Sequence, residues 1–190
     1  NFLKAGIGYG GSCFPKDTKA LNFQSDHAGV KLKTVKATID VNREQRTRLI
    51  DKARRFFPTF RDVRVAIIGL TFKPGTDDLR EAPAKQNIDI LLNEGADIIA
   101  WDPLGAENFR KRYPNCAINF AKDIDEALTD ADVCLIMTEW EKIVEYPLDN
   151  YKKYMKRPLV FDGRNCYKLS EAEKHEIFYD SIGRKIVDTL

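Results

Sequence analysis

The sequence predicts an α/β protein in which a Rossmann-like domain with a parallel sheet follows a helical segment. Within residues 59–190, short apolar runs alternate with amphipathic stretches. This alternation is typical of parallel strands joined by right-handed helical crossovers. Residues 1–58 instead carry apolar residues at helical spacing, up to a proline at position 58. We therefore expect two domains, a helical one over 1–58 and a Rossmann-like one over 59–190.

The helical segment is expected to contain one short and one long helix. The short helix covers about 17–26 and opens after Pro15, and the long helix covers 32–57, where Pro58 stops it. At 1.5 Å per residue the long helix would extend for ~39 Å. Because its centre is polar, we expect it to run between domains or subunits. Its apolar positions are Leu32, Val35, Ile39, Leu49, Ile50, Ala53, Phe56 and Phe57.

The Rossmann-like part is expected to alternate strands with helices. Apolar runs predict strands over 63–69, 97–101, 117–120, 131–137 and 159–161. Amphipathic stretches predict helices over 84–93, 107–112 and 123–128. Gly95 would end the first of these helices, and Asp123 would cap the last.

Composition indicates a globular protein, since 43% of the residues are hydrophobic and 32% are charged. A net charge of +2 is too small to indicate nucleic-acid or anionic-membrane binding. No apolar run approaches the ~20 residues of a membrane span. The four cysteines form no CxxC pair, so we expect no metal site and a reducing, cytoplasmic compartment. The chain begins with asparagine rather than methionine, which suggests a fragment.

The most informative segment is a glycine-rich run that leads into a cysteine, GIGYGGSCFPKD over residues 6–17. Its glycines let the backbone approach a ligand closely. Cys13 is a potential nucleophile, and Lys16 and Asp17 add a cation and a potential base. A loop with a buried cysteine is the simpler interpretation. The spacing is neither a dinucleotide fingerprint nor a P-loop, because no strand precedes it and no Gly-Lys-Ser/Thr closes it.

Residues 2–17, FLKAGIGYGGSCFPKD, resemble the catalytic-cysteine motif of the UDP-glucose/GDP-mannose dehydrogenase family. Ser12 before the cysteine and FPKD after it resemble the UDP-glucose branch of the family more than the amino-sugar branch. GLTFKPGTDDLRE over 69–81 and FDGRN over 161–165 resemble two C-terminal motifs of the family, and NREQR over 42–46 resembles a helix segment. The resemblance therefore extends over most of the chain.

The resemblance implies roles for residues in these motifs. Phe72 and Lys73 would contact the UDP-sugar, and Arg164 would bind the substrate. Arg80 would reach toward NAD held by another domain, and Arg46 would cross a homodimer interface, formed by the long helix, to the sugar site. The residues alone allow simpler interpretations: an ordinary loop, a solvated turn arginine and a salt-bridged helix face.

The resemblance also implies a mechanism. The complete enzyme would oxidise the C6 alcohol of UDP-glucose to the carboxylate of UDP-glucuronate while NAD+ is reduced twice. Cys13 would add to the aldehyde as a thiolate, pass through a thiohemiacetal and a thioester, and be released by water that Asp17 activates. Lys16 would lie near the cofactor and favour the thiolate. The residues expected to hold the glucose and the diphosphate are Phe2, Leu3, Lys4, Gly6, Tyr9 and Gly10.

An NAD-binding half should begin with a strand that leads into GxGxxG, with an acidic residue ~20 positions later. The Rossmann-like part offers only Gly69 after its first strand, so we expect the NAD domain to be absent and the chain alone to be inactive. The alternatives are a dehydrogenase for another nucleotide sugar such as GDP-mannose, a non-catalytic nucleotide-binding or dimerisation module, and a cysteine hydrolase. The hydrolase would need a histidine near Cys13, for which His27 is the candidate.

Overall fold

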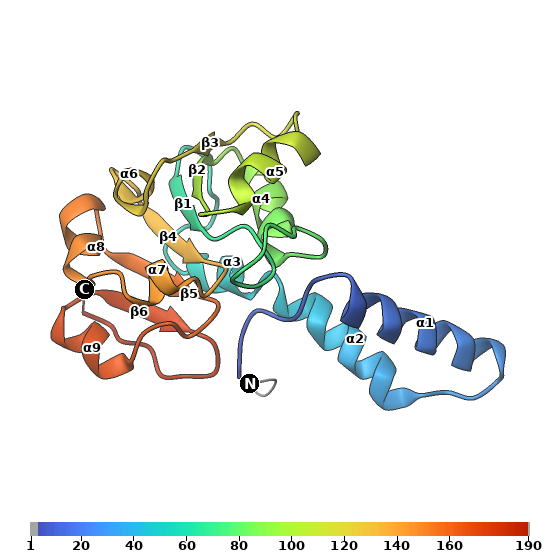
Figure 1. Ribbon diagram of the computed structural model, residues 1–190. Coiled ribbons are helices and arrows are strands. Elements are labelled where there is room, and N and C mark those ends of the chain that lie inside the picture. Colours follow the sequence, from blue (N-terminus) through green and yellow to red (C-terminus); the bar gives the residue numbers. More distant parts are fainter. Residues whose placement is uncertain (1–3, 190) are drawn as a thin grey trace.

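The computed structural model describes residues 4–189 (Figure 1). An α/β body contains the sheet, and a helical arm projects from it. The arm consists of α1 (Cys13–His27) and α2 (Lys33–Gln45), which pack against each other. Within the described residues, no helix is both long enough and apolar enough to cross a membrane.

The described part of the chain forms one parallel sheet, in the order β3-β2-β1-β4-β5-β6. The order reverses between β1 and β4, where Ile67 pairs with Leu135. This is the doubly wound Rossmann arrangement, so the predicted fold class is confirmed. The strands are β1 (Arg64–Ile68), β2 (Asp97–Trp101), β3 (Asn119–Phe120), β4 (Val133–Ile136), β5 (Leu159–Asp162) and β6 (Phe178–Ser181).

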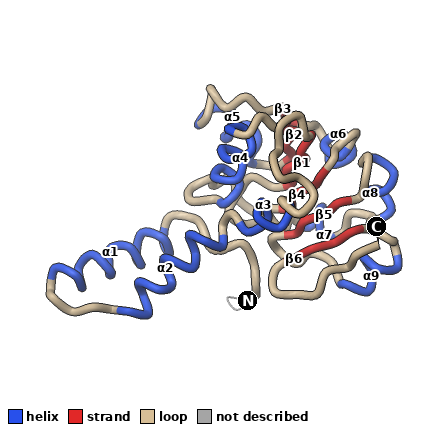
Figure 2. The backbone as a smooth tube through the Cα atoms, turned by 180° about the vertical axis from the view of Figure 1, so that it is seen from behind, coloured by secondary structure: helices blue, strands red, loops and turns tan. Residues whose placement is uncertain are grey.

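Helices cover both faces of the sheet (Figure 2). The first face packs against α3 (Arg48–Ala53), α4 (Pro83–Asn93) and α5 (Gly105–Arg112). The second face packs against α6 (Ile124–Leu128), α7 (Glu141–Val144), α8 (Asp149–Tyr154) and α9 (Leu169–Lys174). Successive strand residues alternate between the two cores: Ile67 joins the first and Ile68 the second. Because both faces are buried, a central strand such as β4 is apolar throughout rather than alternating.

The elements predicted for residues 59–190 are confirmed within a few residues at each end. Gly95 follows α4 with φ of +87°, and the carboxylate of Asp123 caps α6 by accepting from the Glu126 N–H. Sequence reasoning missed β6, α7, α8 and α9. Each of them is four to six residues long, which is too short to show a clear period.

The helical segment differs from the prediction in two ways. α1 begins at Cys13 rather than near residue 17, so Pro15 lies in the first turn, where its missing N–H removes no helical hydrogen bond. In place of one helix over 32–57, α2 and α3 are separated by a turn at residues 46–47. The chain leaves the arm there because α3 packs on the body, where it buries Leu49, Ile50 and Ala53.

Candidate functional site

The glycine segment, residues 4–12, crosses the carboxyl edge of the sheet before the chain enters α1. The N–H of Ile7 donates to the carbonyl of Gly163 at 3.0 Å, just beyond β5, and the Ile7 side chain is fully buried. The N–H of Gly11 donates to the carbonyl of Arg80 at 2.8 Å, in the loop between β1 and α4. Ligands of α/β sheets bind at this edge, so the segment lies where a substrate would be expected.

Phe72, in the loop after β1, packs directly against the glycine segment. A Cβ on Gly11 would lie 2.8 Å from the Phe72 ring, and a Cβ on Gly10 would lie 2.9 Å from the Phe72 Cβ. Gly11 also has φ of +81°, which favours glycine. The neighbouring Lys73 is exposed, with its Nζ 5.4 Å from the centroid of the Phe72 ring. The backbone of the protein therefore covers part of Phe72, while Lys73 faces solvent.

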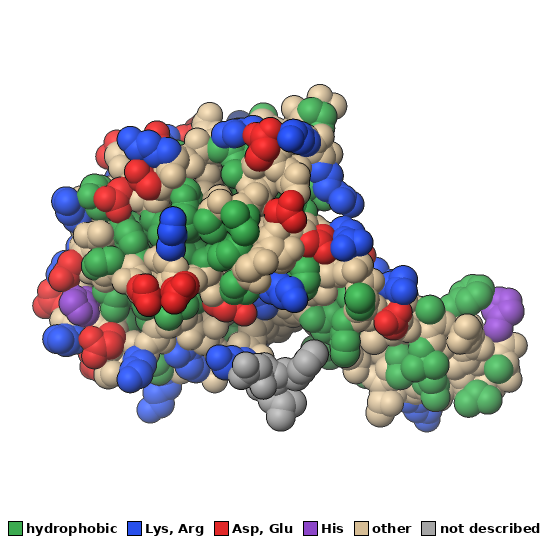
Figure 3. All heavy atoms as spheres, in the orientation of Figure 1, with side chains coloured by type: hydrophobic (Ala, Val, Ile, Leu, Met, Phe, Trp, Pro, Cys, Tyr) green, Lys and Arg blue, Asp and Glu red, His purple; other side chains and the backbone are tan. Residues whose placement is uncertain are grey.

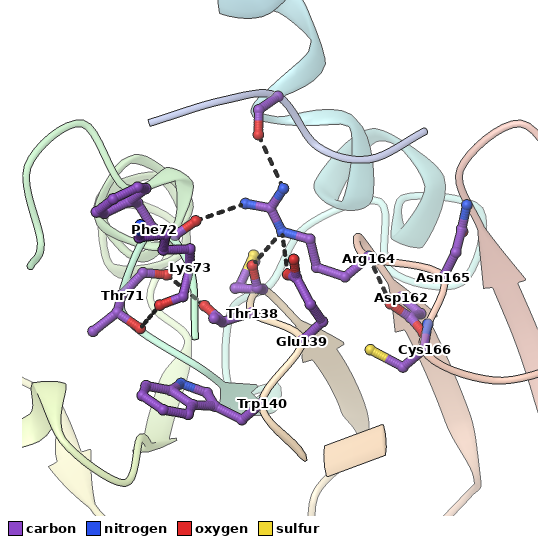
Figure 4. A network of polar contacts seen from close by, with 12 residues as sticks. Thr71, Phe72, Lys73, Thr138, Glu139, Trp140, Asp162, Arg164, Asn165 and Cys166 are labelled. Atoms are coloured by element: carbon purple, nitrogen blue, oxygen red, sulfur yellow. Dashed lines mark hydrogen bonds and ion pairs between the residues drawn. The ribbon is translucent and has the colours of Figure 1, made fainter. Parts of the chain in front are cut away.

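Arg164 joins three segments at the same edge (Figure 4). Its Nε donates to the carbonyl of Met137 at 2.9 Å, and its Nη atoms donate to the carbonyls of Gly8 at 3.0 Å and Phe72 at 3.4 Å. The Nε also lies 3.4 Å from the carboxylate of Glu139. Only 13% of the side chain is exposed, and burial lowers the pKa of the guanidinium. Arg164 is therefore not a solvated turn arginine.

The turn that presents Arg164 is built by Asp162, the last residue of β5. The buried carboxylate accepts the N–H groups of Arg164 and Cys166, each at 2.7 Å, and the Tyr179 hydroxyl at 2.6 Å. Burial raises the pKa of Asp162, and these hydrogen bonds oppose the shift. The FDGRN motif thus has a local structural cause: its aspartate fixes the backbone that aims the arginine.

Cys13 is the first residue of α1 and is exposed to solvent, with its Sγ 3.7 Å from the Ser12 hydroxyl. Backbone dipoles favour negative charge at a helix N-terminus. The loop after β1 comes close to this end of α1, because the carbonyl of Arg80 accepts the N–H of Gly11 at 2.8 Å. The hydrogen bond to Asp78 raises the pKa of the Arg80 guanidinium. The structure thus brings together the backbones of two separate motifs.

Lys16 and Asp17 follow Cys13 on the first turns of α1. Asp17 is four residues after Cys13 and therefore lies on the same helix face. The Lys16 Nζ is 3.2 Å from the Asp17 carboxylate, and the two side chains are 74% and 67% exposed. The prediction that Cys13 and Asp17 are one helical turn apart depended on a helix here, and α1 provides it.

Arg46 is held inside its own chain by Glu81. Its guanidinium pairs with the Glu81 carboxylate at 2.8 Å and donates to the Tyr9 carbonyl at 3.2 Å, and 14% of the side chain is exposed. Lys19 of α1 donates to the second oxygen of Glu81 at 3.0 Å. Hydrogen bonds from Lys19 and then Arg46 lower the pKa of Glu81. Glu81 therefore links the arm to the loop after β1, and a role for Arg46 across a dimer interface stays a prediction.

Sequence reasoning missed the role of Glu81. It also missed two residues of α2 that hold the glycine segment in place. The Asn42 side chain is paired with Tyr9 in both directions, accepting the N–H at 2.8 Å and donating to the carbonyl at 3.2 Å. Gln45 donates to the Gly6 carbonyl at 3.2 Å. Their spacing of three residues places both amides on one helix face, a signal that was not used when the polar centre was predicted to run between domains or subunits.

The structure describes most residues predicted to hold the sugar and the diphosphate. Phe2 and Leu3 lie outside the described residues, and Lys4 is exposed. Gly6, Tyr9 and Gly10 belong to the glycine segment, and Gly6 and Tyr9 line a hollow of about 590 Å³ between this segment and α2. His27, at the far end of α1, packs against Phe23, so nothing places its imidazole beside the Cys13 thiol as a hydrolase would need.

The described residues offer no ready site for a dinucleotide or a metal ion. Gly69 has φ of +92°, but a Cβ there would lie 2.6 Å from the Thr138 Cβ, so this glycine lets β1 pack closely on β4. Asp102 follows β2, where a dinucleotide-binding domain binds ribose, but its oxygens accept the N–H groups of Leu70 and Gly105. No group of three or more potential metal ligands is found among residues 4–189.

Comparison with known proteins identifies two regions of similarity. Residues 66–169 match the UDP-binding domain of the UDP-glucose/GDP-mannose dehydrogenase family. Residues 1–44 match the central domain of the same family. The first region contains the loop after β1 and the turn of Arg164, and the second contains the glycine segment and the whole of α1.

Individual relatives agree with this match. The UDP-glucose 6-dehydrogenase YwqF of Bacillus subtilis is 43% identical over 98% of this chain and 42% of its own length. A UDP-glucose dehydrogenase structure from Pyrobaculum islandicum has a TM-score of 0.81 at 28% identity, over 95% of this chain and 39% of its own. A GDP-mannose dehydrogenase structure from Pseudomonas aeruginosa has a TM-score of 0.72 at 26% identity, over 85% and 37%. The chain spans about two fifths of the length of these relatives.

Proposed function

The chain belongs to the UDP-glucose/GDP-mannose dehydrogenase family, and on that basis we propose that it is the substrate-binding, cysteine-bearing part of an NAD-dependent UDP-glucose 6-dehydrogenase. The course of the glycine segment is the observation that supports this most directly. The segment crosses the ligand-binding edge of the sheet and leads straight to Cys13 at the start of α1.

We assign the nucleotide diphosphate to Lys73 and Arg164. Lys73 is exposed beside Phe72 and can act as a point charge for phosphate. Arg164 directs several N–H donors at the same edge, and a guanidinium can bind phosphate oxygens in pairs. The match of residues 66–169 to a UDP-binding domain agrees with this assignment. We assign the glucose to the glycine segment, through Lys4, Gly6, Tyr9 and Gly10, together with Phe2 and Leu3.

In the proposed reaction, Cys13 is the nucleophile. Its thiolate sulfur forms a bond to the aldehyde carbon of the sugar, and the carbonyl electron pair moves to oxygen, giving a thiohemiacetal. The backbone dipoles at the N-terminus of α1 favour negative charge at this position. At the later thioester stage, water replaces the sulfur and yields the carboxylate. Asp17, on the same helix face, is the residue we assign to accept the proton of that water.

Bound NAD would supply the hydride acceptor for both oxidations. Because the carboxyl end of β1 does not fit a dinucleotide, we propose that NAD is bound mainly by a part of the protein outside these 190 residues. Lys16 and Arg80, both exposed, are the residues of this chain that we assign to face it. A reducing, cytoplasmic compartment would keep the Cys13 thiol free for this role.

We also propose that the arm forms a homodimer interface. Apolar side chains gather on its surface (Figure 3), and Phe23 and Val41 are 63% and 61% exposed. Exposed apolar patches of this kind mark interaction sites. Sedimentation velocity should show a dimer that the double variant Phe23→Asp/Val41→Asp converts to a monomer. The variant Leu104→Asp changes an apolar residue of the body that is 52% exposed, and it should stay dimeric. A dimeric double variant would exclude the arm as the interface.

Titration calorimetry with UDP-glucose and GDP-mannose tests the proposed substrate. We expect UDP-glucose to bind selectively and the Lys73→Met variant to bind it about tenfold more weakly, because one charge contact to phosphate is lost. We expect no NAD-dependent oxidation by the 190-residue chain alone. Selective binding of GDP-mannose would instead support the second candidate, a GDP-mannose dehydrogenase, which the similarity to the Pseudomonas aeruginosa structure keeps open.

A further inference from the structure

Asp102 directly follows β2 at the carboxyl edge of the sheet, and 5% of the residue is exposed. In a dinucleotide-binding Rossmann domain, an acidic residue at the end of this strand accepts the hydroxyls of a ribose. In the Rossmann-like part of this chain a carboxylate occupies the same topological position, although the carboxyl end of β1 does not fit a dinucleotide. What this carboxylate binds instead is visible in its hydrogen bonds.

The Asp102 carboxylate accepts its hydrogen bonds from groups of its own chain. A carboxylate has about four lone-pair positions, and six donor groups surround this one. The Thr71 hydroxyl among them also lies 3.1 Å from the Lys73 carbonyl, to which its single proton can go instead. The five N–H groups alone outnumber the lone-pair positions, so none is left for a ligand hydroxyl. The six donor groups are the N–H of Leu70 at 2.7 Å, the N–H and the hydroxyl of Thr71 at 3.2 Å each, the indole N–H of Trp140 at 3.1 Å, and the N–H groups of Leu104 at 3.0 Å and Gly105 at 2.6 Å.

These donors come from three separate elements. Leu70 and Thr71 begin the loop between β1 and α4, Trp140 follows β4, and Gly105 is the first residue of α5. Thr71 immediately precedes Phe72 and Lys73, and Figure 4 shows the three residues together at the Arg164 network. The hydroxyl of Thr138 also donates to the Thr71 carbonyl, so the backbone at Thr71 is fixed from both sides.

We propose that Asp102 is a positioning residue for nucleotide-sugar binding: it fixes the loop that presents Phe72 and Lys73, and it does not itself touch the ligand. This inference rests on the proposed function for the identity of the ligand. The chemistry explains the need for a carboxylate. Two charged oxygens can accept from donors on both sides, whereas an asparagine would turn an NH2 group toward N–H donors.

The experiment compares Asp102→Asn with the unchanged 190-residue chain, using hydrogen exchange and UDP calorimetry. We expect amide exchange at Leu70 and Thr71 to accelerate by about tenfold or more, and the Kd for UDP to rise by about tenfold, because at least one charge-assisted hydrogen bond is lost. Exchange in β5 should not change. The control Asp132→Asn removes a carboxylate that accepts the Arg64 N–H at the opposite end of β1, and it should leave both readouts unchanged.

Two milder variants keep the inference testable if Asp102→Asn does not fold. Trp140→Phe removes only the indole donor to Asp102, whereas Thr71→Val removes a hydroxyl that contacts both Asp102 and the Lys73 carbonyl. Each variant should accelerate exchange at Leu70 and weaken UDP binding by about threefold, and the urea midpoint of unfolding should fall by less than these losses imply. Unchanged exchange at Leu70 in the variants would overturn the anchoring role. If the smaller fraction of folded protein fully explained the weaker UDP binding of the variants, the positioning role would be overturned. If the unchanged chain did not bind UDP, the proposed function would fail, and the ligand part of this inference with it.

Discussion

Arg164→Lys should separate the contribution of the guanidinium shape from that of the positive charge. Arg164 donates to the carbonyls of Met137, Gly8 and Phe72, which belong to three different segments. Lysine keeps the charge opposite Glu139, but its ammonium is a single point that cannot reach three separated acceptors. The substitution therefore keeps the charge pair with the exposed Glu139 while it disconnects the glycine segment from the body.

The expected loss follows from the hydrogen bonds that lysine cannot replace. If the ammonium keeps one of the three acceptors, two carbonyls at a largely buried position lose a charged donor. Each such loss costs about 1–2 kcal/mol, so the free energy of unfolding should fall by about 2–4 kcal/mol. The fall should be larger than for Arg110→Lys, an exposed residue of α5, where a change within about 0.5 kcal/mol is expected.

Urea unfolding followed by the fluorescence of Trp101 and Trp140 measures this difference, since both side chains are buried in the body. Hydrogen exchange provides the local readout: the amides of Ile7 and Gly11, which bond to Gly163 and Arg80, should exchange faster in Arg164→Lys. An unfolding free energy equal to that of the Arg110→Lys variant, with unchanged exchange at Ile7, would refute the assignment of Arg164 as the link between these segments.

Two further predictions concern the same junction. Gly11→Ala should destabilise the protein by about 2–3 kcal/mol, because strain at φ of +81° adds to the close contact of the new Cβ with Phe72. The control Gly29→Ala has φ of +71° but no atom within 4 Å of the new Cβ, and it should cost about 1 kcal/mol. Equal losses of the two variants in urea unfolding would contradict the packing argument. Lys19 and Arg46 lower the pKa of Glu81, so its stabilising effect is present above the ordinary pKa of 4.5 and is lost as the pH falls below that value. The stability difference between the unchanged chain and Glu81→Gln should therefore shrink below pH 4.5, and a difference independent of pH would show that the ion pairs contribute nothing.

The sheet was predictable because the residue types of a strand reflect whether its two faces are buried. A strand buried on both faces, such as β4, is apolar throughout, and that pattern needs no distant partner to be recognised. The glycine run and Cys13 were equally easy to recognise, because a run of glycines directly before a cysteine is an unusual combination of residues. The resemblance to a family depended on this run and on the motifs over 42–46, 69–81 and 161–165, and not on the buried strands.

The break between α2 and α3 was not predictable from local sequence. Arg46 and Thr47 are compatible with a helix, and no glycine or proline marks the turn. The chain turns because Leu49 and Ile50 pack on the sheet and because Arg46 pairs with Glu81, which is 35 residues away. Asp102 was overlooked for a related reason: its six donors come from residues up to 38 positions away, and a sequence pattern cannot show such convergence.

The chemistry proposed for Cys13 depends on contacts between the arm and the body rather than on α1 alone. The glycine segment leads directly into α1. Arg164 of the body and Asn42 of α2 fix the position of this segment. Across space, Lys19 of α1 reaches Glu81 in the loop after β1. If these links failed, Cys13 would keep its helix N-terminus but lose its place relative to the loop after β1. We therefore expect substitutions at Arg164 and Glu81 to alter catalysis through the position of the thiol, although neither residue lies in the cysteine motif.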